Sequence, residues 1–93
     1  MIDAPVVSVH IPPPFRGLVD GHDEVTASGD TVREILEALG HEYPAIRSRL
    51  VSEDGMLKSG VAVFLGARSI RDLQGLETPI DLEEVVSIVP TGE

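Results

Sequence analysis

The stretch that decides the fold of this chain is TVREILEALG, residues 31–40. Thr31 and Glu34 form a capping box, in which the threonine caps the start of a helix and the glutamate three residues later bonds back. Gly40 is typical of the residue just beyond a helix end. The apolar residues of the stretch recur at helical spacing, which places them on one face that we expect to be buried: Val32, Ile35, Leu36 and Leu39.

Predicted strands lie on both sides of this helix in the sequence. Residues 6–11 alternate between apolar and polar side chains and stop at the prolines of residues 12–14, as expected for a half-buried strand. A loop rich in Gly and Asp, residues 17–23, follows, so we expect a hairpin with a long connection. A short second helix is expected from Tyr43 to Leu50, with Pro44 near its first turn. Further strands are expected over residues 24–27, 61–65, 69–71 and 84–90, with a connection over residues 72–82.

This order of elements predicts an α+β fold. A helix that follows a strand pair and precedes the remaining strands can cover one face of a small mixed sheet. The chain of 93 residues is long enough for one core, so we expect a single domain over residues 1–93. Only one Tyr and two Phe are present, and we therefore expect a core of Val, Ile, Leu and Ala.

Composition excludes several classes of function. Cysteine is absent, which excludes disulfides, thiolate metal sites and a cysteine nucleophile. The formal net charge of −9 argues against nucleic acid as a partner, because phosphate binding needs clustered cations. The basic residues instead appear scattered along the sequence: Arg16, Arg33, Arg47, Arg49, Lys58, Arg68 and Arg71.

The sequence also gives an expectation about location. Residues 1–5 have neither the basic region nor the apolar core of a signal peptide. No apolar run approaches the roughly 18 residues needed to span a membrane. We therefore expect a cytoplasmic protein without a membrane partner.

Several motifs together resemble the ThiS/MoaD ubiquitin-like sulfur-carrier family, from about Val6 to Pro90. The resemblance implies a β-grasp fold: a mixed sheet of four to five strands with one main helix packed on one face. It does not distinguish carriers for cysteine, molybdopterin or thiamin synthesis. The motifs that carry it are, in chain order, SGDTVREIL (residues 28–36), YP (43–44), VFLG (63–66), IR (70–71), GLETP (75–79) and EVVSIVP (84–90).

The resemblance implies a protein cosubstrate, not an enzyme. In this family an activating enzyme, an adenylyltransferase and sulfurtransferase, adenylates the C-terminal carboxylate with ATP. Sulfur then replaces the nucleotide, and the resulting thiocarboxylate donates sulfur to a partner synthase. The carrier itself is expected to bind no cofactor, because ATP belongs to the activating partner.

The carrier tail implied by the resemblance comprises Pro90, Thr91, Gly92 and Glu93. Proline lacks a backbone donor, so we expect Pro90 to end the strand ladder and residues 91–93 to be flexible. Family members usually end in Gly-Gly, whereas one glycine and a charged residue stand here. The tail is trimmed or atypical, or has lost its chemistry, or the sequence stops short. If it is trimmed, removal of Glu93 leaves a terminal Gly92 and is an activation step.

The resemblance further implies that the sheet face turned away from the helix meets partner proteins. Phe64 and Val89, with His10, are placed on that face by the alternation of their strands, and we expect Phe64 and Val89 to be exposed there. The alternative is that Phe64 is partly buried beneath the loop that follows its strand.

Other candidate sites are weaker. Residues 20–24, DGHDE, gather three carboxylates and an imidazole, but their spacing fits no known calcium loop, and His22 has no partner at zinc-site spacing. We expect a solvated loop and no metal. No catalytic cluster or phosphate loop stands out, so the functional alternative to a carrier is a β-grasp binding module or subunit without a reactive tail.

Overall fold

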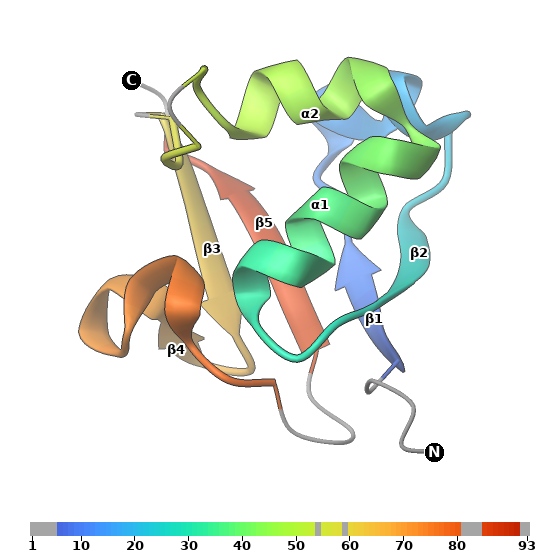
Figure 1. Cartoon of the computed structure of the whole chain (residues 1–93). Coiled ribbons are helices and arrows are strands. Elements are labelled where there is room, and N and C mark those ends of the chain that lie inside the picture. The colour runs from blue at the N-terminus through green and yellow to red at the C-terminus, as the bar shows by residue number, and fades with distance from the viewer. Residues whose placement is uncertain (1–5, 54, 59, 81–84, 92–93) are drawn as a thin grey trace.

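The computed structural model describes residues 6–53, 55–58, 60–80 and 85–91. Two α-helices and three short 3₁₀ helices accompany five strands (Figure 1). The strands are β1 (Val6–His10), β2 (Glu24–Ser28), β3 (Val61–Leu65), β4 (Arg68–Ser69) and β5 (Val85–Pro90). The helices are α1 (Val32–Glu42), α2 (Pro44–Leu50), η1 (Pro13–Val19), η2 (Ile70–Asp72) and η3 (Gly75–Glu77).

The five strands form one mixed sheet in the order β2-β1-β5-β3-β4. β1 and β2 are antiparallel, which confirms the predicted hairpin, and β5 runs parallel to β1 and antiparallel to β3. Both α-helices lie on the same face of this sheet (Figure 1). The structure therefore confirms the α+β architecture, with β5, the last strand in the sequence, at the centre of the sheet.

Helix α1 begins as the sequence predicts. The Thr31 hydroxyl accepts a hydrogen bond from the Glu34 N–H at 3.3 Å, and Glu34 Oε1 accepts one from the Asp30 N–H at 2.8 Å. The Glu34 side chain thus bonds to the N–H of Asp30, the residue before the cap, and not to the N–H of Thr31 as a standard capping box would. The four residues of the predicted apolar face are each at most 2% exposed, which confirms that they belong to the core: Val32, Ile35, Leu36 and Leu39.

The predicted helix end at Gly40 is wrong, because α1 continues to Glu42. Gly40 is buried inside the helix, where α2 packs against α1. A Cβ atom on Gly40 would lie 2.8 Å from Cβ and 2.9 Å from Cγ of Arg47. Glycine is thus needed there for the close approach of the two helices, not for a helix terminus.

The connection between β1 and β2 is more ordered than expected. Residues 13–19 form η1, and Phe15 and Val19 of this helix are buried in the core, 6% and 0% exposed. The expectation of a core without aromatic residues is therefore wrong at Phe15. The brief strand expected at residues 69–71 is β4, shifted to Arg68–Ser69, and η2 follows it directly.

Candidate functional site

The candidate carrier tail leaves the sheet from its central strand. β5 pairs with β1 from Val85 to Ser87 and with β3 from Val86 to Pro90. Because β5 has a neighbour on each side, its direction is fixed by two ladders. Thr91, which follows Pro90, consequently lies at one defined end of the sheet, beside the start of β3.

Pro90 is the last residue of β5 and of its pairing with β3, as predicted, although one more backbone bond follows it. Pro90 lies opposite Val61, and the Thr91 N–H donates to the Gly60 carbonyl at 2.9 Å. This bond makes Pro90 and Val61 a non-hydrogen-bonded pair, in which the nitrogen of Pro90 faces away from β3. On that side the pairing with β1 has already ended at Ser87, so the missing N–H of proline breaks no bond.

Thr91 is exposed, and its backbone N–H is held by this bond to Gly60, while the flexibility expected of the tail stays a prediction. The other two residues of the predicted tail, Gly92 and Glu93, lie outside the described residues. The described part of the site therefore ends with an anchored Thr91 at the edge of β3.

The face of the sheet turned away from the helices carries the predicted docking residues. Alternation places Val7, Val9, Val86 and Ile88 in the core and their neighbours on this open face. Strand register aligns one row of open-face residues across the sheet, in the order Glu24, His10, Ser87, Phe64 and Ser69.

The two apolar docking residues are diagonal neighbours on this open face. Phe64 lies opposite Ser87, and Val89, two residues further along β5, lies opposite Ala62. Phe64 is half-buried and Val89 is 38% exposed. The structure thus brings Phe64 and Val89 to one apolar area close to the tail, although Phe64 is less exposed than expected; their contact with a partner stays a prediction.

His10 lies further from this apolar area, toward the β2 edge. Its Nε2 atom is 3.6 Å from Glu24 Oε2, and both side chains are about half exposed, 56% and 50%. The pair gains little energy at such exposure. His10 and Glu24 therefore give the open face a polar border rather than a reactive centre.

Sequence reasoning missed one residue of this open face. Val6 is the most exposed large apolar residue of the described chain, at 63%. It lies at the start of β1, opposite Ser28, on the same face as Ser8 and His10. The alternation that placed His10 there also contains Val6 and was sufficient to find it.

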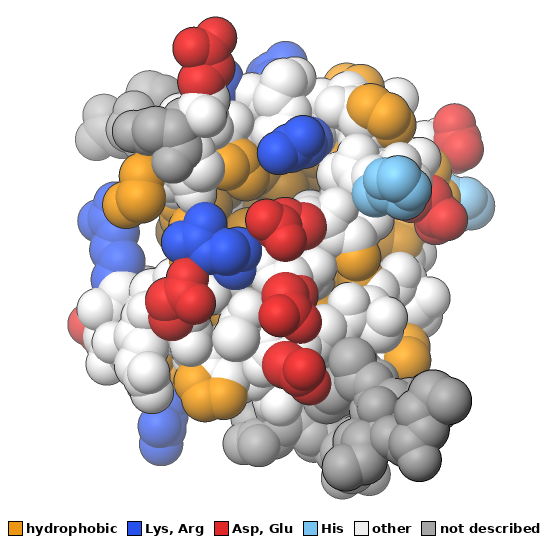
Figure 2. All heavy atoms as spheres, in the orientation of Figure 1, with side chains coloured by type: hydrophobic (Ala, Val, Ile, Leu, Met, Phe, Trp, Pro, Cys, Tyr) orange, Lys and Arg blue, Asp and Glu red, His pale blue; other side chains and the backbone are white. Residues whose placement is uncertain are grey.

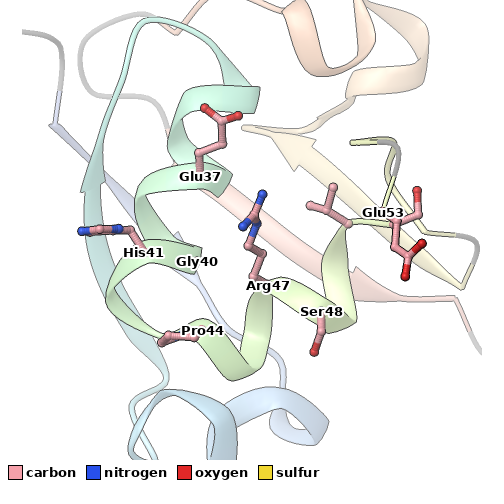
Figure 3. Close-up of a pocket in the computed structure, with 9 residues that line it drawn as sticks. Glu37, Gly40, His41, Pro44, Arg47, Ser48 and Glu53 are labelled. Atoms are coloured by element: carbon pink, nitrogen blue, oxygen red, sulfur yellow. The ribbon is translucent and has the colours of Figure 1, made fainter.

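A groove on the helical side of the molecule is lined by α1, α2 and the residues after α2 (Figure 3). Its polar side chains do not converge: Glu37 and His41 point in different directions, and Ser48 and Glu53 point away from Arg47 (Figure 3). Within the described ranges, no three His, Cys, Asp or Glu side chains are placed to hold a metal ion, and residues 20–24 are no exception. The groove therefore shows no catalytic arrangement.

None of the described helices is long and apolar enough to cross a membrane.

Comparison with known proteins gives one consistent result. The model of the ThiS family matches residues 9–92. The sulfur carrier protein CysO of Mycobacterium tuberculosis is 34% identical over 86 residues, which cover 90% of this chain and 92% of the relative. A putative sulfur carrier protein of Archaeoglobus fulgidus is 31% identical over 71 residues, or 76% and 81% of the two chains.

The similarity extends to solved structures. A chain in the crystal structure of the Amycolatopsis orientalis BexX/CysO complex matches with a TM-score of 0.87 and 30% identity, over 94% of this chain and 97% of that one. The same comparison identifies the fold as the ubiquitin-like β-grasp, as the sequence motifs implied. That complex shows that a protein of this type binds a partner protein.

Proposed function

The chain belongs to the ThiS family, and from this premise we infer that it is a sulfur-carrier protein. It acts as a protein cosubstrate and not as an enzyme, like its carrier relatives. The observation that carries this conclusion is a family match over residues 9–92, which runs through β5 into the candidate tail. The relatives are carriers, so a binding module without a reactive tail is not favoured.

We propose that the reaction takes place at the C-terminal carboxylate of the tail. A carboxylate oxygen attacks the α-phosphate of ATP, pyrophosphate leaves, and an acyl-adenylate forms. Hydrosulfide sulfur then attacks the acyl carbon, the bond to AMP breaks and AMP leaves, which gives the thiocarboxylate. ATP is bound by the activating enzyme, so the carrier needs no cofactor of its own. Because this step consumes ATP, we place it in the cytoplasm.

The position of β5 supports this role. A central strand paired on both sides holds the base of the tail, up to Thr91, in a defined position. An activating enzyme can then align the reacting carboxylate by binding the folded domain, which lowers the entropic cost of bringing the reactants together.

We further propose that the open face near Phe64 and Val89 binds the partner proteins, both the activating enzyme and the sulfur-accepting synthase. Apolar side chains on a face that no helix covers are typical of an interaction surface. Phe64 supplies an aromatic anchor, and the small residues around it, Ala62 and Ser87, allow a partner side chain to approach closely.

The carrier function is tested by intact-mass spectrometry. The protein is incubated with its activating enzyme, ATP and a sulfur source, and we expect its mass to increase by the difference between sulfur and oxygen. Omission of ATP, and a form that is truncated after Pro90, are expected to abolish the increase. Absence of the increase, with an enzyme that is active on another carrier, would contradict the proposal.

The same assay tests the expectation about the two residues outside the described structure. A form that ends at Gly92 is compared with one that ends at Glu93. A second negative charge beside the reacting carboxylate is costly to bury, so the Gly92 form is expected to be activated faster. Equal rates for the two forms would show that the enzyme tolerates Glu93.

A further inference from the structure

The charges of this acidic chain are separated in space, although they look scattered in the sequence. Residues 20–42 contain seven carboxylates and one arginine, and the carboxylates of α1 gather along its exposed side (Figure 2). In contrast, residues 12–19 and 44–50 contain three arginines and no carboxylate. These two segments are η1, with the proline before it, and α2, which pack against each other.

The basic segments lie at the end of the sheet where the tail emerges. β1 and β5 are parallel, so η1, which follows β1, begins at the end where β5 stops. Lys58 adds one cation between α2 and the tail, where it lines a pocket together with the exposed Glu53. Its N–H bonds to the Leu50 carbonyl at the end of α2, and two residues later Gly60 accepts the bond from Thr91. α2 and the end of β5 lie at the same edge of the molecule (Figure 1).

Two of the arginines at this end contact neutral groups. Arg16 Nε donates to the Ile11 carbonyl at 3.0 Å, and the Arg49 guanidinium carbon lies 5.7 Å from the centre of the Phe15 ring. The ion pairs among the described residues are His10–Glu24 and Arg33–Glu77. Arg16, Arg49 and Lys58 therefore have no described carboxylate within 4 Å, and their charges are available to a partner.

We propose that Arg16, Arg49 and Lys58, named here the tail-end basic surface, dock against an acidic surface around the active-site entrance of the activating enzyme. This cationic surface is complementary to an acidic one, and it offsets locally the repulsion that an acidic partner would exert on a carrier of net charge −9. A basic end on an acidic molecule orients the approaching carrier so that its tail enters first. This inference rests on the proposed carrier function.

Chemistry favours the activating enzyme over the synthase as the occupant. Before activation the tail ends in an ordinary carboxylate, a group that every protein chain has at its C-terminus and that therefore cannot distinguish this protein from others. The activating enzyme must therefore recognise the folded surface around the tail. After activation, the thiocarboxylate itself identifies the carrier to the synthase.

The test compares two charge-neutralising pairs. R49Q/K58Q removes two cations at the tail end, and the control R68Q/R71Q removes two exposed cations from the opposite end, where β3 leads into β4. Both pairs change the net charge equally. For the R49Q/K58Q pair we expect the Kd for the activating enzyme to rise about tenfold at low salt, mainly through slower association, with less than about a twofold change for the control.

Two further measurements keep the result interpretable. Lys58→Gln alone, which leaves the Arg49–Phe15 contact intact, is expected to raise the Kd about threefold, and a denaturant melt checks the folding of each variant. Added salt is expected to reduce the difference between the two pairs. Equal effects of the two pairs on the Kd, or no effect of either, would overturn the proposal, because the position of the cations on the molecule would then not affect binding.

The mass assay separates this result from the carrier function. If the wild-type protein binds the enzyme but gains no sulfur, the carrier function fails, while the Kd comparison still decides on the tail-end basic surface. If the wild-type protein gains sulfur but R49Q/K58Q binds as tightly as R68Q/R71Q, only the docking proposal fails.

Discussion

The two faces of the sheet are made by the same strands and differ in almost every property. On the helix-covered face, Val9, Val63 and Val86 are 0–1% exposed. On the open face, the residues next to them in sequence include His10, Phe64 and Ser87, which are half-buried or exposed. Strand alternation thus allows one short segment to stabilise the fold and to present a surface for partners.

Because of this difference, we expect mutations on one face to change stability and mutations on the other face to change binding. Substitutions on the covered face act on the free energy of unfolding, because they remove contacts in a packed core. Substitutions on the open face act on affinity, because the atoms that they remove contact solvent in the free protein. Each variant below is therefore measured both by denaturant unfolding and by binding to the activating enzyme.

The largest effect is expected for Leu36→Ala on the covered face. Leu36 is 2% exposed, and its truncation leaves a cavity that should lower the free energy of unfolding by about 2–5 kcal/mol. Under conditions in which the variant remains folded, its affinity for the partner should not change. A loss below about 0.5 kcal/mol in urea melts would show that the helix face is misplaced.

Gly40→Ala tests the contact between the two helices on the same side. The new methyl group would meet Arg47 at 2.8–2.9 Å, and we expect a loss of about 1–2 kcal/mol in the free energy of unfolding, although alanine favours a helix.

Gly17→Ala is the matched control for Gly40→Ala, since no atom lies within 4 Å of its added Cβ. We expect it to change stability by less than about 0.5 kcal/mol. If Gly40→Ala is stabilising, the close approach of α1 and α2 is not constrained as the structure indicates.

Phe64→Ala is expected to show most clearly that the open face acts on binding and not on stability. The affinity for a partner should fall by more than about 1 kcal/mol, because the variant loses an aromatic anchor, while the protein remains folded. Ser69→Ala, the neighbour of Phe64 in the same row at the sheet edge, should leave the affinity unchanged. Isothermal titration calorimetry measures both, and equal affinities for Phe64→Ala and the wild-type protein would remove Phe64 from the docking face.

The smallest effect is expected at the helix cap. Thr31→Ala removes the bond to the Glu34 N–H, which is long at 3.3 Å, so the free energy of unfolding should fall by about 0.5–1 kcal/mol. Thr31→Ser keeps the hydroxyl and should retain most of the stability in thermal melts. A loss as large as that of Leu36→Ala would mean that Thr31 has a role beyond capping.

Sequence periodicity was sufficient for the main elements of the fold. The apolar face of α1, the place of Pro44 in the first turn of α2 and the alternation of β3 all depend on neighbours a few residues apart, and all three are confirmed. The placement of Phe64 and Val89 on one face also followed from alternation. Their proximity did not, because it requires the antiparallel register of β3 and β5.

The sequence by itself determined the helix, the strands and which side of each strand is apolar, because these depend on local spacing along the chain. Only the tertiary structure decided that Gly40 lies at a helix contact, that Phe15 enters the core and that Thr91 is anchored to Gly60. It also decided that Arg16, Arg49 and Lys58 share one end of the molecule. The physical reason is that each of these features needs segments distant in sequence to pack or pair, and local propensity contains no information about such partners.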